Sequence, residues 1–160
     1  MTAHAPETPA LVIDERVAMA NIARFQAHCD AAGLALRPHI KTHKLPLFAR
    51  AQIAAGACGI TVQKIGEAEV MADAGIDDIL LTYNILGVDK LARLAAVARR
   101  GERFAVVADS AATVDGLGAA FAREDRPLTV LVECDTGAGR CGVQTAEAAA
   151  GLAARIDATD

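Results

Sequence analysis

The 160-residue sequence predicts an α/β protein in which helices cover a mostly parallel β-sheet. Near-continuously apolar runs of about four to eight residues alternate with helical patterns along the chain, as in sheets that are buried on both faces. The hydrophobic content of 53% is too high for a disordered chain. The length suits one domain with a substantial core.

The first half of the chain contains three strand–helix pairs. Strands are expected over Ala10–Asp14, Leu34–Lys41 and 59–64, and helices over 16–33, 46–56 and 66–75. Asp14 is expected to cap the first helix, and Gly33 to end it. Pro46 suits the first turn of the second helix. The apolar face of the first helix is expected to carry Ile22, Phe25 and Cys29.

The second half repeats the same alternation. Strands are expected over 78–84, 104–109 and 128–135, and helices over 90–101, 110–125 and 145–156. Asp89 and Thr145 are the expected caps of two of these helices, while Gly116 and Gly118 weaken the one between them. The strands are too few to close a barrel, and an open doubly wound sheet is an alternative architecture.

Composition excludes several classes of function. A net charge of −4, with 3% aromatic residues and no basic stripe, argues against nucleic-acid binding. No apolar stretch reaches the roughly 18 residues of a membrane span. Residues 1–9 read as a flexible tail without the pattern of a secretory signal. The four cysteines form no CxxC pair, so reduced thiols and a cytoplasmic location are expected.

The segment "RPHIKTHK" (37–44) concentrates basic side chains at the end of a predicted strand. Strand alternation places Arg37, His39 and Lys41 on one face, and in a barrel the lysine would reach the catalytic rim. Neighbouring cations such as Arg37 and Lys44 would favour a neutral amine, which can attack an aldehyde such as pyridoxal phosphate. A solvated basic loop is an equally good interpretation. A metal site formed by His39 and His43 is disfavoured. A spacing of four residues brings two side chains together on a helix, but not across the end of a strand and the turn after it.

The segment "DTGAGRCG" (135–142) matches the pattern G-x-G-x-x-G through Gly137, Gly139 and Gly142. That pattern is a dinucleotide-binding fingerprint, although it normally lies in the first strand–turn–helix unit and ends inside the helix. Here it comes late, and the expected cap Thr145 lies beyond it. A dinucleotide site is therefore a minor alternative. Glu133 and Asp135 are two positions apart on one face. A paired acid is one interpretation, and the preferred one is that one of them orients Arg140 or a neighbouring turn.

Polar residues also end the two middle strands and are expected at the mouth of a pocket: Gln63, Lys64, Tyr83 and Asn84. Tyr83, the only tyrosine, is a candidate contact for a cofactor or substrate. Packing against the rim is an equally good interpretation.

Three stretches, "TPALVID", "RPHIKTHK" and "GITVQKIGEAEVMADAGIDDILLTYN", resemble the D-threonine aldolase and D-serine dehydratase family, whose pyridoxal-phosphate enzymes share the alanine racemase barrel fold. The resemblance implies an incomplete parallel (β/α) TIM-type barrel over 10–160, with about five barrel strands. The strand at Ala10–Asp14 would join a separate C-terminal β-domain. Lys41 would carry the cofactor covalently, His39 and Tyr83 would contact it, and Arg140 would bind its phenolic oxygen.

By the same resemblance, the expected substrate is a small β-hydroxy D-amino acid, cleaved or dehydrated by a pyridoxal-phosphate-dependent lyase. A divalent metal is expected to bind the β-hydroxyl, with ligands in a C-terminal part not contained in these 160 residues. The full-length protein is expected to be a homodimer, and this chain alone to have little activity. The alternatives are a non-catalytic pyridoxal-phosphate barrel protein, an amino-acid racemase and, more distantly, a dinucleotide-binding domain.

Overall fold

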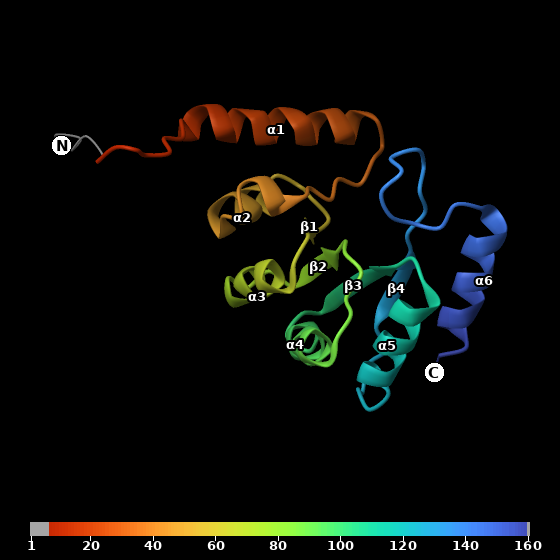
Figure 1. Cartoon of the computed structure of the whole chain (residues 1–160). Coiled ribbons are helices and arrows are strands. Elements are labelled where there is room, and N and C mark those ends of the chain that lie inside the picture. The colour runs from red at the N-terminus through yellow and green to blue at the C-terminus, as the bar shows by residue number, and fades with distance from the viewer. Residues whose placement is uncertain (1–6, 160) are drawn as a thin grey trace.

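The computed structural model describes residues 7–159 and shows one parallel sheet with helices along its outer side (Figure 1). The sheet has the order β1 (Ile60–Val62), β2 (Asp78–Leu81), β3 (Arg103–Ala108), β4 (Thr129–Val132). Each strand pairs in parallel with the next one in the chain. This sequential, unclosed arrangement confirms the incomplete (β/α) barrel. Four strands form within residues 7–159, where about five barrel strands were predicted.

The described residues contain six α-helices: α1 (Glu15–Ala31), α2 (Pro46–Ala54), α3 (Ile65–Asp73), α4 (Val88–Ala98), α5 (Ala111–Phe121) and α6 (Ala146–Asp157). Asp14 and Thr145 cap α1 and α6 as predicted, by accepting hydrogen bonds from Val17 N at 3.0 Å and Ala148 N at 3.1 Å. Pro46 begins α2. Within residues 7–159, no helix combines the length and apolar composition that a membrane crossing requires.

The core lies between the sheet and the helices. Alternate strand residues face it and are almost completely buried: Ile60, Val62, Ile79, Leu81 and Val106. They belong to one hydrophobic cluster with helix residues such as Met71, Leu94 and Val97. The opposite face, which would line the lumen of a closed barrel, is more polar and partly open. It carries Asp78, Thr82 and Glu133, which are half-buried.

The strand predicted at Ala10–Asp14 does not form. Leu11 and Val12 are 92% and 77% exposed, and the segment pairs with no strand in the described part of the chain. A strand is stabilised by hydrogen bonds from a neighbouring strand, so an apolar segment without one remains irregular. Of the tail predicted over 1–9, residues 1–6 lie outside the described residues, and residues 7–9 contain no helix or strand.

Two details of the predicted helices are wrong. Phe25 is 57% exposed, and the buried residues of α1 are Gln26 and Cys29; the helix packs mainly against α2. Asp89 is not a cap. The N-cap of α4 is Gly87, and Asp89 lies in the first turn, where a carboxylate interacts favourably with the helix dipole.

Candidate functional site

Lys41 lies in a tight turn and not at the end of a strand. Residues 34–38 are irregular, His39 forms a single parallel bridge with Thr61, and a 3₁₀ turn, η1 (Ile40–Thr42), follows at once. The turn forms because His39 Nδ1 accepts a hydrogen bond from Lys41 N at 3.2 Å, and because Ile40 is completely buried in the core. The predicted strand Leu34–Lys41 is therefore reduced to one bridge, although Lys41 still lies at the rim.

The two lysines of "KTHK" have different surroundings. Lys44 has a left-handed backbone (φ 54°), and its Nζ lies 2.8 Å from Oε1 of Glu67, whose side chain is only 7% exposed. Lys41 is exposed and forms no ion pair within residues 7–159. The turn thus separates one lysine held by a carboxylate from one with an accessible amine.

The cations predicted to crowd Lys41 each have a carboxylate partner in the structure. The guanidinium of Arg37 lies 2.6 Å from Oδ1 of Asp78, and Lys44 is paired with Glu67. Each cation thus has a partly or fully buried carboxylate as its partner, and both charges are largely neutralised locally.

His39 connects the lysine turn to the end of β2. Burial, and then the charge of Lys41, lower the pKa of His39, which favours the neutral ring. Because Nδ1 is an acceptor, Nε2 carries the proton and donates to Thr82 Oγ1 at 3.4 Å. The Thr82 hydroxyl in turn donates to Val62 O at 3.2 Å. Thr82 was missed in the sequence, because it lies inside the predicted strand 78–84, whereas β2 ends at Leu81 in the structure.

His43 serves a different part of the turn. Its Nδ1 accepts from Leu45 N at 3.0 Å, and its ring packs edge-on against Phe48, 5.7 Å between ring centroids. Burial lowers the pKa of His43. His39 and His43 thus each use Nδ1 to accept a hydrogen bond from a backbone N–H two residues later in the chain.

Asn84 joins the ends of three strands. Its Oδ1 accepts from Asp109 N at 3.0 Å, and its Nδ2 donates to Glu133 Oε2 at 3.3 Å. Cys141 Sγ donates to Glu133 Oε1 at 3.1 Å, and Asp109 Oδ2 accepts from Gly142 N at 3.1 Å. Asp109 and Cys141 were not singled out in the sequence, although Asp109 directly follows β3. The network fixes the glycine-rich turn against the rim of the sheet.

The glycine-rich turn is organised around Asp135. Its Oδ1 accepts hydrogen bonds from the backbone N–H groups of Gly137, Ala138 and Gly139 at 2.8–3.1 Å. The N–H of Gly137, then Gln144, and then Gly139 lower the pKa of Asp135. These are donors of the kind that bind a pyrophosphate in a dinucleotide site, and here the protein's own carboxylate occupies them. This arrangement argues against the dinucleotide alternative.

Arg140 projects from the same turn and is exposed. Its pKa is raised, first by hydrogen bonding and charge at Cys141 and then by the charges of Glu133 and Tyr83. Tyr83 is 55% exposed. It lines a cavity of about 680 Å³ between α3 and α4 that also contains three of the predicted rim residues, Gln63, Lys64 and Asn84.

The candidate site residues form two groups, one at the end of β2 and one on the turn after β4. His39 accepts a hydrogen bond from the backbone N–H of Lys41 and contacts Thr82 at the end of β2. Arg140 lies on the turn after β4, within electrostatic reach of Tyr83, the residue that follows Thr82. Within residues 7–159, no group of three His, Cys, Asp or Glu side chains is placed to hold a metal ion.

Comparisons with known proteins identify the family. Residues 13–160 match the family model of the alanine racemase N-terminal domain. The chain is 42% identical over 137 residues to a D-threonine aldolase of Arthrobacter sp. and 43% identical over 138 residues to the D-threo-3-hydroxyaspartate dehydratase of Delftia sp. strain HT23. Each match covers 86% of this chain and 36% of the relative.

The fold agrees with these matches. The crystal structure of a D-threonine aldolase from Filomicrobium marinum superposes with a TM-score of 0.90 at 37% sequence identity, over 94% of this chain and 41% of that one. The chain thus spans less than half the length of these relatives. It belongs to the alanine racemase N-terminal domain family and is similar to the N-terminal part of D-threonine aldolases and D-threo-3-hydroxyaspartate dehydratases.

Proposed function

We propose that this chain is the cofactor-binding part of a pyridoxal-phosphate-dependent lyase acting on β-hydroxy D-amino acids, and that Lys41 holds the cofactor covalently. The main support is the contrast between the two lysines of the turn. Lys44 is engaged by the buried carboxylate of Glu67, whereas Lys41 is exposed and forms no ion pair within the described residues. An amine that attacks an aldehyde must be accessible and free of a bound carboxylate.

The other predicted site residues fit the same cofactor. Arg140 stays charged and exposed on the turn after β4, so it can hold an ionised phenolic oxygen without exchanging a proton. His39 is neutral by virtue of its lowered pKa and directs its N–H to Thr82, so it can contact the cofactor without adding charge. Tyr83 has an exposed ring within electrostatic reach of Arg140.

When bound, pyridoxal phosphate supplies an electron sink for the bond broken at the substrate α-carbon. Three residues of the chain have separate roles in binding and orienting the cofactor. Lys41 Nζ attaches the cofactor and is the basic group able to carry a proton there. Arg140 orients the phenolic oxygen, and the neutral His39 supports the Lys41 turn through the backbone N–H of Lys41.

The finer assignments rest on the named relatives, which include an aldolase and a dehydratase. Aldol cleavage or dehydration of a D-amino acid is proposed for the complete protein, because the chain spans 36% of these relatives. The divalent metal, the homodimer and the cytoplasmic location stay predictions. No step is assigned to a metal, since the described residues provide no group of ligands for one.

Covalent attachment tests the proposal directly. The purified chain is mixed with pyridoxal phosphate, reduced with borohydride and mapped by mass spectrometry, while circular dichroism monitors folding. We expect a stoichiometric adduct on Lys41 that is lost in Lys41→Met. The matched variant Lys44→Met should retain it. A folded wild-type chain that is modified at Lys44, or at scattered surface lysines, would refute the assignment.

The reaction class is tested with D-threonine and D-threo-3-hydroxyaspartate. Cleavage of the first gives glycine and acetaldehyde, and dehydration of the second gives a 2-oxo acid and ammonia. We expect a protein that joins this chain to a C-terminal part like that of the named relatives to form one of these product pairs, and the 160-residue chain to form little of either. Full turnover by Lys41→Met would contradict the proposal.

A further inference from the structure

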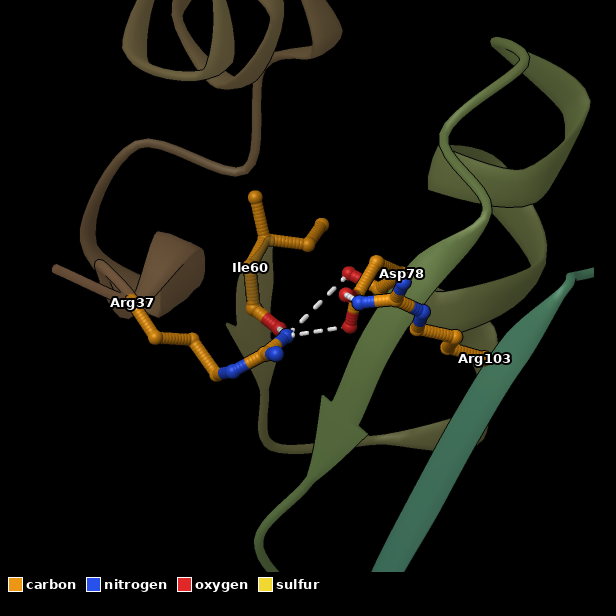
Figure 2. A network of polar contacts seen from close by, with 4 residues as sticks. All are labelled: Arg37, Ile60, Asp78 and Arg103. Atoms are coloured by element: carbon orange, nitrogen blue, oxygen red, sulfur yellow. Dashed lines mark hydrogen bonds and ion pairs between the residues drawn. The ribbon is translucent and has the colours of Figure 1, made fainter. Parts of the chain in front are cut away.

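Arg37 connects the segment that carries Lys41 to a strand that is not its neighbour. Its Nη1 lies 2.6 Å from Asp78 Oδ1, 3.4 Å from Asp78 O and 3.5 Å from Ile60 O. Figure 2 shows the side chain passing β1 at Ile60 to reach Asp78 at the start of β2. One guanidinium therefore links three consecutive extended segments of the barrel.

Gly59 leaves room for this crossing. A Cβ atom at position 59 would lie 2.2 Å from Arg37 Nη1 and 2.8 Å from both Cγ and O of Asp78. Any side chain there would displace the guanidinium or the start of β2. The chain thus has a glycine where Arg37 and Asp78 meet.

Arg37 is the least exposed cation among the ion pairs of the described residues. The side chains of Arg37 and Asp78 are 27% and 20% exposed, whereas those of Arg155 and Asp115, also an arginine–carboxylate pair, are 49% and 56% exposed. Arg103 approaches the second oxygen of Asp78 at 3.7 Å but is 81% exposed (Figure 2). A partly shielded pair is screened less by water than a surface pair, so it can hold a fixed geometry.

Lys41 follows Arg37 by four residues, and the intervening chain is held at successive points. Pro38 O accepts from Thr61 N at 2.8 Å, His39 bridges to Thr61, and Ile40 is completely buried. Pro38 itself has no N–H to donate to a sheet. Leu36 O also accepts a backbone hydrogen bond, from Cys58 N at 2.9 Å, so Arg37 adds a side-chain attachment to those that the backbone makes on either side of it.

We propose that Arg37 is a positioning residue for Lys41, acting through Asp78 across Gly59. The proposal rests on the proposed function, because it assigns Arg37 a role in presenting the Lys41 amine to the cofactor. The role assigned to Arg37 involves no direct contact with the Lys41 amine or the cofactor. Its effect is transmitted through the backbone of residues 38–40, which the sheet and the core hold in place.

The test measures the rate at which pyridoxal phosphate attaches to Lys41, per folded molecule, and the circular dichroism of the bound cofactor in its visible band. We expect Arg37→Met to slow attachment about tenfold or more, as for a reacting group misplaced by a distant change, and to alter the visible band. Arg37→Lys should restore part of the rate. The matched control Arg155→Met should change neither readout.

Gly59→Ala provides a second, independent route to the same displacement. Its Cβ is expected to move the guanidinium and slow attachment in the wild-type background. In the Arg37→Met background it should add little to that rate, because the contact it disrupts is already gone. The Cβ added by Gly59→Ala would also clash with Asp78 O in both backgrounds and lower stability in each. The attachment rate is therefore the quantity that tests the proposal.

The outcomes separate the two proposals. Attachment to Lys41 in Arg37→Met at the wild-type rate, with an unchanged visible band, would overturn the positioning role and leave the proposed function intact. Failure of the folded wild-type chain to attach the cofactor at Lys41 would overturn both. If Arg37→Met does not fold, Arg37→Lys and Asp78→Asn decide the question: unchanged rates in both overturn the role, and slowed rates support it.

Discussion

Glu67 joins the turn after Lys41 to the end of β1. Its Oε1 lies 2.8 Å from Lys44 Nζ, and its Oε2 accepts from Gln63 N at 2.8 Å. Burial alone would raise the pKa of Glu67, but the hydrogen bonds from Lys44 and from the backbone of Gln63 outweigh it, so the pKa is lowered. The carboxylate thus stabilises the native chain in its charged form.

We expect Glu67→Gln to lower the free energy of unfolding by about 1–2 kcal/mol near neutral pH, a modest loss because Lys44 is half exposed to water. Since the pKa of native Glu67 lies below its ordinary value of 4.5, the charge contributes fully above that pH and is lost as the pH falls through the native pKa. Urea denaturation should show that the difference in free energy of unfolding between wild type and Glu67→Gln becomes smaller below pH 4.5. Glu69→Gln, which breaks a more exposed pair with Arg93, should cost less.

The pKa of His39 should respond to Lys41. It is lowered first by burial and then by the charge of Lys41, so Lys41→Met should raise it toward 6.5. An NMR titration of the ring measures this shift, and Lys44→Met should produce a smaller one. No change in Lys41→Met would mean that the amine does not lie near the ring.

The same histidine should make stability depend on pH. Because the native pKa of His39 is below its unfolded value of 6.5, the unfolded chain binds the proton first as the pH falls. The stability that neutral His39 contributes is complete above the unfolded pKa of 6.5, and it is lost as the pH falls through the lower native pKa. His39→Asn keeps an acceptor for Lys41 N but does not titrate, so its stability should fall less than that of wild type between about pH 7 and pH 5. Equal slopes would contradict the assignment.

Asp135 should control the order of the glycine-rich turn. Asp135→Ala removes the acceptor of three backbone N–H groups, so amide hydrogen exchange at 137–139 should become faster. Asp135→Asn retains one carbonyl oxygen and should have a smaller effect. Unchanged exchange in Asp135→Ala would show that the carboxylate does not hold the turn.

Two glycines of this turn should differ in their tolerance of alanine. Gly137 (φ +118°) has no atom within 4 Å of an added Cβ, whereas at Gly142 (φ +100°) a Cβ would lie 2.5 Å from Asp135 N and 2.6 Å from Cys134 C. Gly137→Ala should cost about 1–2 kcal/mol for its backbone conformation. Gly142→Ala should cost about 1–3 kcal/mol more, because backbone atoms must move. Thermal or urea denaturation of both variants provides the comparison.

Much of the fold follows from local chemistry and was predictable. Apolar runs located the four strands, and Asp14, Thr145 and Pro46 marked the starts of their helices. The errors concern burial and pairing. Phe25 has the spacing of a core residue but faces solvent, and the apolar segment at Ala10–Asp14 has no strand to pair with among the described residues.

The sequence by itself determined the alternation of strands and helices, the family, and the candidate lysine in "RPHIKTHK". The tertiary structure decided which of the neighbouring lysines is engaged and what holds the other in place. Arg37 reaches Asp78 across 41 positions of chain, and Asn84 reaches Glu133 across 49. Such partners depend on strand order and register, which bring distant residues to one rim, and no local pattern of residues encodes them.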